Sequence, residues 1–155
     1  MLKSYPRNMG DPAVQLVSNQ LVACYDLTCE IYRDGSWQHL RDTMHRRRGF
    51  SSAVRGDAVL LIGGESTHTT ELISINGSPA RPGPFNVTRH GYHHCTIQVS
   101  ARTIIVTGGS ASEDHVTEYH LIDGSETPMT SLLQGREDHA CGFYLKSNNQ
   151  KVGSG

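Results

Sequence analysis

Short runs of apolar and β-branched residues alternate along the chain with clusters of glycine, serine, asparagine and aspartate. In the middle of the chain such runs occupy residues 50–54, 58–63 and 70–74, and a weaker fourth run lies near 85–87. Runs of this length and composition, bounded by turn-forming residues, are typical of β-strands rather than helices. The pattern therefore predicts an all-β chain without long amphipathic helices.

The same order of segments recurs along the sequence. The apolar run that ends in Gly63-Gly64 returns before Gly108-Gly109, a shift of 45 residues, and the run 70–74 returns at 117–121. An arginine, followed by an aromatic residue or histidine and by small residues, opens each copy, in the segments 47–53, 89–95 and 136–142. Units of four strands that repeat at about 42–47 residues are typical of β-propeller blades.

A weaker copy precedes these units, with Cys24-Tyr25 at the place of the diglycine and with the only tryptophan, Trp37, before the next arginine. Glycine at the end of an inner strand permits a positive φ and lets neighbouring backbones approach closely. We therefore assign structural roles to Gly63, Gly64, Gly108, Gly109 and Trp37.

In these motifs the chain resembles the kelch-repeat propellers, whose blades carry an arginine segment, an apolar run with a diglycine, a Thr-Glu type pair and a tryptophan in this order. The resemblance implies an all-β, kelch-type β-propeller in the form of an incomplete ring of about three four-stranded blades plus one strand. The expected boundaries are an N-terminal extension 1–12, repeats at about 13–46, 47–88 and 89–135, the start of a further repeat at 136–145, and a polar tail 146–155. We expect the chain to be a fragment of a longer propeller, and an open arc that associates with another copy is the alternative.

Composition narrows the kinds of partner. The net charge is −1, from 14 basic and 15 acidic side chains, so no overall field attracts nucleic acid or an anionic membrane. No window approaches the roughly 18 apolar residues of a membrane span, and the first residues lack the apolar core of a signal peptide. We therefore expect an intracellular, cytoplasmic chain with no nucleic-acid or membrane partner.

The cysteines and two asparagines also carry information about the environment of the chain. No two cysteines form a C-x-x-C pair, and all lie in apolar or β-type segments, so we expect small buried thiols. These are Cys24, Cys29, Cys95 and Cys141. Asn76-Gly77-Ser78 and Asn86-Val87-Thr88 match the N-glycosylation pattern, which would matter only in a secreted protein.

The resemblance further implies that loops at one end of the propeller bind a peptide or protein. The residues that would form this surface are Arg47, Arg48, Phe50, Arg89, His90, Tyr92, Arg136 and His139. Planar guanidinium groups suit the capture of carboxylates, so Arg47, Arg89 and Arg136, at one phase of the repeat, favour an acidic peptide. The alternative is that each arginine fastens its own turn by bonding backbone carbonyls.

Metal binding and catalysis are not expected. His93 and His94 are neighbours in the sequence, and in a strand such neighbours point to opposite faces, so they cannot readily bind one ion. The chain has no G-x-S-x-G turn, P-loop or H-E-x-x-H helix. We predict a protein-interaction module with no catalytic residue, metal or cofactor. A fragment of a kelch-type enzyme of the oxidase or sugar-epimerase class, and a structural segment of a larger multidomain adaptor, are the alternatives.

Overall fold

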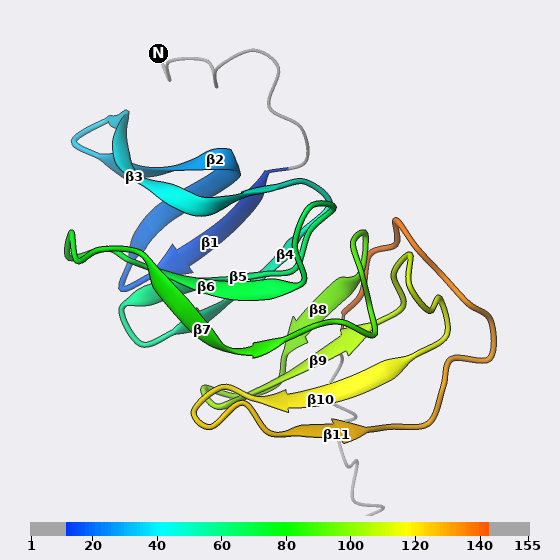
Figure 1. Cartoon of the computed structure of the whole chain (residues 1–155). Coiled ribbons are helices and arrows are strands. Elements are labelled where there is room, and N and C mark those ends of the chain that lie inside the picture. Colours follow the sequence, from blue (N-terminus) through cyan, green and yellow to red (C-terminus); the bar gives the residue numbers. More distant parts are fainter. Residues whose placement is uncertain (1–11, 143–155) are drawn as a thin grey trace, which may run out of the picture.

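The computed structural model describes residues 12–142, and this part of the chain consists of strands and turns (Figure 1). Its described residues contain no helix that is long and apolar enough to cross a membrane. The strands are β1 (Ala13–Val17), β2 (Gln20–Arg33), β3 (Ser36–Arg47), β4 (Ser51–Arg55), β5 (Ala58–Ile62), β6 (Thr69–Ser74), β7 (Arg81–Asn86), β8 (Cys95–Gln98), β9 (Thr103–Thr107), β10 (Val116–His120) and β11 (Glu126–Pro128).

These strands form three antiparallel sheets, each from consecutive segments of the chain. The first sheet has the order β1-β2-β3, the second β4-β5-β6-β7 and the third β8-β9-β10-β11. In the second sheet, β4, β5 and β6 begin and end within one residue of the runs expected at 50–54, 58–63 and 70–74. The fourth strand, β7, begins earlier than the run near 85–87 and carries two prolines, which suit its position at the edge of the sheet.

The long strand β2 reverses direction near its middle. Its first half pairs with β1, where Ala13 lies opposite Cys24, and its second half pairs with β3. The Cα atoms of Cys24 and Cys29 are 4.1 Å apart, whereas five residues of straight strand would span about 16 Å. Asp26, between them, has a φ of 46°, the left-handed conformation of a tight turn. The first sheet therefore contains four strand segments, like the other two.

The second sheet is packed between the other two. All five residues of β5 are buried, and successive side chains of a strand point to opposite faces. Leu60 and Ile62 belong to a core with residues of the third sheet, and Val59 and Leu61 belong to a core with residues of the first. The third sheet contributes Ile104, Val106, Tyr119 and Leu121 to the former core, and the first sheet contributes Val17, Val22, Cys24, Cys29 and Ile31 to the latter.

The first strand of each sheet lies against the first strand of the next, since β1 contacts β4 and β4 contacts β8. Polar side chains join these strands. Gln15 Nε2 donates to Ser52 Oγ at 2.8 Å, and Gln98 both accepts from Val54 N at 2.9 Å and donates to Val54 O at 2.7 Å. Because the first strands of the sheets are joined in this way, the loops that precede β4 and β8 are brought together at one end of the molecule.

The expectation of free thiols was wrong. Cys24 is bonded to Cys29, and Cys95 is bonded to Cys141, so none of the four cysteines is free. The sequence concealed the first pair because Gln20–Arg33 has the composition of one continuous strand, and only the reversal within it brings the two sulfur atoms together. No strand is assigned to residues 136–142, where a further unit was expected to begin, and 143–145 and the tail 146–155 lie outside the described residues.

We predict that the two disulfides differ in their contribution to stability. Replacing Cys95 and Cys141 with serine should cost about 4 kcal/mol and replacing Cys24 and Cys29 about 2 kcal/mol, because the first bridge closes the longer loop. Urea unfolding of the two double variants measures the difference. Alkylation of the unreduced protein, followed by mass spectrometry, should find no reactive thiol. Four alkylated cysteines in protein folded under oxidising conditions would contradict the assignment.

Candidate functional site at the converging loops

A short chain of backbone hydrogen bonds links the loop before β4, the loop before β8 and the final described segment. Gly49, His93 and Asp138 have φ values of 56°, 57° and 51°. His93 N donates to Gly49 O at 2.6 Å, and Asp138 N donates to His93 O at 3.0 Å. Left-handed residues other than glycine are uncommon, and histidine and aspartate are among the types enriched there. We call these three residues the backbone column.

The side chains of the backbone column are also in contact. His93 Nδ1 lies 3.1 Å from Asp138 Oδ1, and the Tyr92 ring packs edge-on against the His93 ring with centroids 4.8 Å apart. A Cβ atom at Gly49 would overlap the His93 ring, so glycine is required at this position for space as well as for its φ. The Tyr92 ring, the His93 imidazole and the Asp138 carboxylate therefore lie side by side, although they come from two consecutive units.

A pocket of about 210 Å³ lies beside the column. Its lining consists of the column itself and the residue that follows each member, namely Gly49, Phe50, His93, His94, Asp138 and His139. Phe50 and His94 are buried, with 9% and 6% of their surfaces exposed, whereas the Asp138 side chain is 67% exposed. The pocket therefore combines a buried aromatic and imidazole wall with a carboxylate that is open to solvent.

The loops after the diglycines close around the same region. Glu65 N donates to Arg48 O, and Ser110 N donates to Tyr92 O, both at 2.9 Å. Gly109 N donates to Arg136 O, also at 2.9 Å. All four glycines of the two pairs have positive φ, and a Cβ at Gly109 would overlap the carbonyl oxygen of His90. The loops after the diglycines are therefore hydrogen-bonded to the loops before β4 and β8.

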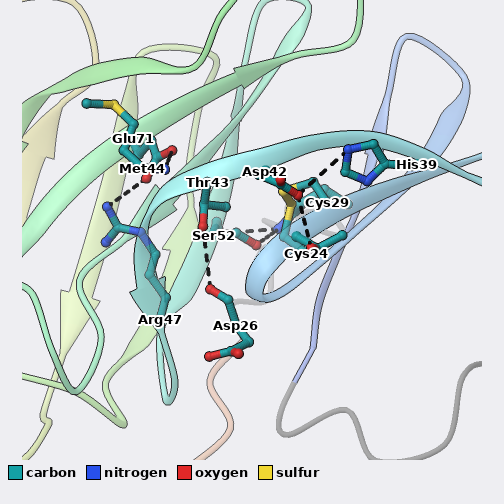
Figure 2. The surroundings of a disulfide bond; sticks show 12 residues. Cys24, Asp26, Cys29, His39, Asp42, Thr43, Met44, Arg47, Ser52 and Glu71 are labelled. Atoms are coloured by element: carbon teal, nitrogen blue, oxygen red, sulfur yellow. Dashed lines mark hydrogen bonds and ion pairs between the residues drawn. A yellow bond between two sulfur atoms is a disulfide. The ribbon is translucent and has the colours of Figure 1, made fainter.

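Arg47 lies inside the protein, with 1% of its surface exposed. Its Nη1 donates to Gly63 O at 2.7 Å and to Thr69 O at 2.8 Å, and its Nη2 lies 3.2 Å from Glu71 Oε2. Glu71, also buried, accepts a hydrogen bond from Met44 N at 2.6 Å (Figure 2). Burial lowers the pKa of Arg47, and Glu71 opposes this shift. Arg47 therefore does not present its guanidinium to a partner; it fastens the turn after β5 to the end of β3, the alternative considered for the arginines.

His90 holds the corresponding place in the third sheet. It is fully buried, with Nδ1 2.9 Å from Gly108 O and Nε2 2.9 Å from Thr117 Oγ1. Arg47 and His90 therefore each bond the carbonyl of the first glycine of a diglycine. The sequence comparison had matched Arg47 with Arg89, because the loops before β4 and β8 differ in length and the arginine was the more conspicuous residue.

The other candidate residues lie at or near the surface. Arg48 is 63% exposed and 4.0 Å from Asp26, and Arg89 is 49% exposed and 3.6 Å from Glu126. The exposed Arg136 is held by its backbone, since its N donates to Glu113 O at 2.7 Å. His139 is half-buried, with Nε2 2.9 Å from Thr107 Oγ1.

Trp37 belongs to the first sheet and does not line the pocket. It lies opposite Tyr32 in the β2–β3 pairing, with the two ring centroids 5.4 Å apart. Among the described residues no group of three or more histidine, cysteine, aspartate or glutamate side chains is placed to hold a metal ion. The arrangement at the converging loops is therefore one of hydrogen-bonding and aromatic groups beside a small pocket.

Sequence reasoning did not single out Gly49 or Asp138, although both line the pocket. The signal in the sequence was a residue that tolerates positive φ at the same place in two units. Gly49 lies two positions before β4, and His93 lies two positions before β8. Gly, His and Asp share that tolerance but little else, so a comparison by side-chain type does not match them.

Three histidines of this region, His90, His94 and His139, have lowered pKa values. Burial, with His90 nearby, lowers the pKa of His94 to about 4. Burial also lowers the pKa of His90 and of His139, and Arg136 adds to the effect at His139. These three imidazoles are therefore neutral at pH 7.

Comparisons with known proteins concern the fold. No family model matches the chain, and no curated protein matches its sequence. Among solved structures 108 chains match. One of them, described as "Structure of YjhT", has a TM-score of 0.76 and 9% sequence identity, over 88% of this chain and 54% of the other. At this identity the likeness is one of fold alone. The chain spans about half the length of that structure.

We predict that Arg47 and its neighbour Arg48 contribute very differently to stability. Arg47→Ala leaves the Glu71 carboxylate buried without its cation and should cost about 3–5 kcal/mol. Arg48→Ala, at an exposed side chain, should change the free energy of unfolding by less than about 0.5 kcal/mol. Urea unfolding measures both, and the double variant with methionine at positions 47 and 71 should recover part of the loss. Equal unfolding midpoints for the two alanine variants would remove Arg47 from its structural role.

We also predict that stability falls as the pH falls from about 6.5 to 4. The pKa of His94 is about 4 in the folded protein, against 6.5 for a free histidine, so protons bind the unfolded chain first. The stabilisation is complete above pH 6.5 and decreases by the order of 3 kcal/mol toward pH 4. Melting temperature against pH measures the slope. His94→Gln should make the slope shallower, whereas the exposed His39→Gln should not; an unchanged slope in His94→Gln would contradict the assignment.

Proposed function

We propose that the three sheets are blades of a kelch-type propeller and that the chain binds a peptide or protein partner at the converging loops. The observation that supports this most directly is the backbone column, because it joins loops from separate sheets into one surface beside a pocket. Loops held on a rigid β-scaffold are a common location for binding residues. The likeness of fold to a solved structure about twice as long is consistent with a partial ring.

The partner's chemistry follows from the exposed charges in the loops before β4 and β8 and in the final described segment. Arg48, Arg89 and Arg136 are exposed and can reach carboxylates of a partner, and guanidinium groups bind carboxylates in bidentate geometry. The pocket itself has the carboxylate of Asp138 at its edge and neutral imidazoles within. A neutral side chain, rather than an acidic one, therefore suits the pocket. We infer an acidic segment that places one neutral side chain in the pocket and its carboxylates on the arginines.

The proposal gives the chain no catalytic residue and no cofactor. Three of the buried polar groups described above hold the loops: Arg47 and His90 bond the diglycine carbonyls, and Glu71 neutralises Arg47. The groups left for a partner are arginines, an aspartate and aromatic rings. These groups suit recognition, and they do not include a nucleophile with an adjacent base.

The disulfides also bear on where the chain works. Structural disulfides are rare in the cytoplasm, where thiols are kept reduced, and persist in secreted and extracellular proteins. All four cysteines of this chain are paired. In place of the cytoplasmic location expected from the sequence, we propose an oxidising compartment.

We predict that peptides selected from a random display library against the oxidised chain will be rich in aspartate and glutamate. Arg136→Glu or Arg89→Glu should weaken binding of a selected peptide by about tenfold or more, since each reverses a charge that the peptide contacts. Fluorescence anisotropy measures the affinity.

The matched control is Arg102→Glu, an exposed arginine in the turn between β8 and β9, at the opposite end of the third sheet. It makes the same change of net charge and should leave the affinity unaltered. Equal losses from Arg102→Glu and Arg136→Glu would show binding to net charge and would exclude a site at the converging loops. Enrichment of basic peptides would refute the inferred partner chemistry.

A further inference from the structure

The two N-glycosylation patterns lie on either side of β7. Asn86-Val87-Thr88 is at the end of that strand, and Asn76-Gly77-Ser78 is in the turn between β6 and β7. The pattern has meaning only in a chain that enters the secretory pathway. The paired cysteines favour an oxidising compartment independently of the asparagines, and the inference below rests on that proposed location.

Asn86 has the geometry of an acceptor. Asn86 and Thr88 are exposed, whereas Val87 between them is fully buried in the core with the third sheet. Alternate side chains of an extended segment point to the same side, so the amide of Asn86 and the hydroxyl of Thr88 both face solvent. The backbone is fixed there, because Val87 N donates to His68 O at 2.8 Å. A glycan on Asn86 would project outward without displacing a core residue.

The position also suits what a glycan does physically. β7 pairs with β6 on one side and is the last strand of its sheet. An unpaired strand edge can pair with another chain, and proteins protect such edges with charges, prolines or bulky cover. β7 already carries Pro82 and Pro84, and a glycan at its end would add cover where the prolines stop.

Asn76 differs in that its side chain is already used within the turn. Its Nδ2 donates to Asp57 Oδ2 at 3.0 Å, and its Oδ1 accepts from Ser78 N at 2.9 Å and Ser78 Oγ at 2.6 Å. These bonds form a compact asparagine turn, a common reason for asparagine in loops. Asn76 is therefore a natural control: it has the same pattern, 10 residues away, with a structural reason to be present.

We propose that Asn86 carries an N-linked glycan. In the reaction, Nδ2 of Asn86 forms a bond to the anomeric carbon of an oligosaccharide carried on a lipid pyrophosphate. The bond from that carbon to the pyrophosphate oxygen breaks, the lipid pyrophosphate leaves, and Nδ2 loses one proton. The sugar donor and the transferase belong to the secretory pathway, and this chain supplies only the acceptor.

The test is expression of the whole chain behind a cleavable secretion leader in a eukaryotic host, with peptide N-glycosidase treatment of both cell lysate and medium. The wild type should show one glycosidase-sensitive species. Asn86→Gln and Thr88→Ala should each abolish it, and Asn76→Gln should keep it. Thr88→Ser, which retains the hydroxyl, should restore it at least partly. Mass spectrometry after the enzyme should find aspartate at position 86.

Two results would overturn the proposal: a wild-type chain whose mobility is unchanged by the enzyme, and a glycan that remains in Asn86→Gln. Because lysate and medium are both analysed, a variant that folds poorly and is retained in the cell still reports its glycan. The outcome is also independent of the peptide-binding experiment, since Asn86 does not line the pocket and the arginine variants do not alter the acceptor pattern.

Discussion

Packing of each sheet against the next through alternate faces of its strands is the constraint on which the rest of the structure depends. β5 has no polar residue and is buried throughout, so it requires an apolar neighbour on both sides. The first sheet supplies one neighbour and the third supplies the other. Once the sheets are stacked in this way, the first strands β1, β4 and β8 lie side by side, and the loops before β4 and β8 converge at one end. The position of the candidate site is thus a result of core packing.

Polar groups then decide how the converging loops are held. Arg47 and His90 are chemically different, but the side chain of each is hydrogen-bonded to the carbonyl of the first glycine in a diglycine. A buried arginine requires a buried carboxylate, and Glu71 supplies it, whereas a neutral histidine requires only the hydroxyl of Thr117. The same mechanical task is therefore performed with a charge in one unit and without one in the next.

The strands could be predicted from the sequence because their signal is local: apolar runs between turn-forming residues mark β4, β5 and β6 closely. The diglycines could be placed because a positive φ restricts the residue type. What could not be predicted depends on contacts between units. The burial of Arg47 depends on Glu71, 24 residues away, and the pocket depends on a hydrogen bond from His93 to Gly49. By residue type, Arg47 was matched with Arg89. In the structure the residue with the same role as Arg47 is His90, because both side chains bond the carbonyl of the first glycine of a diglycine.

Where the sequence departs from its own repeat, covalent bonds take the place of the missing features. In the second and third sheets the turn after the second strand is closed by a backbone bond from the first glycine, Gly63 N to Thr69 O and Gly108 N to His115 O. The first sheet has no diglycine, and there the Cys24–Cys29 disulfide joins the two halves of β2 beside the turn.

The segment 136–142 has no strand pairing, and the Cys95–Cys141 disulfide ties it to β8. Asp138 and His139, which line the pocket, belong to this segment, so oxidation of the cysteines helps to hold one wall of the candidate site in place. The fold of the sheets follows from apolar packing, but the completeness of the site also depends on the redox state of the chain.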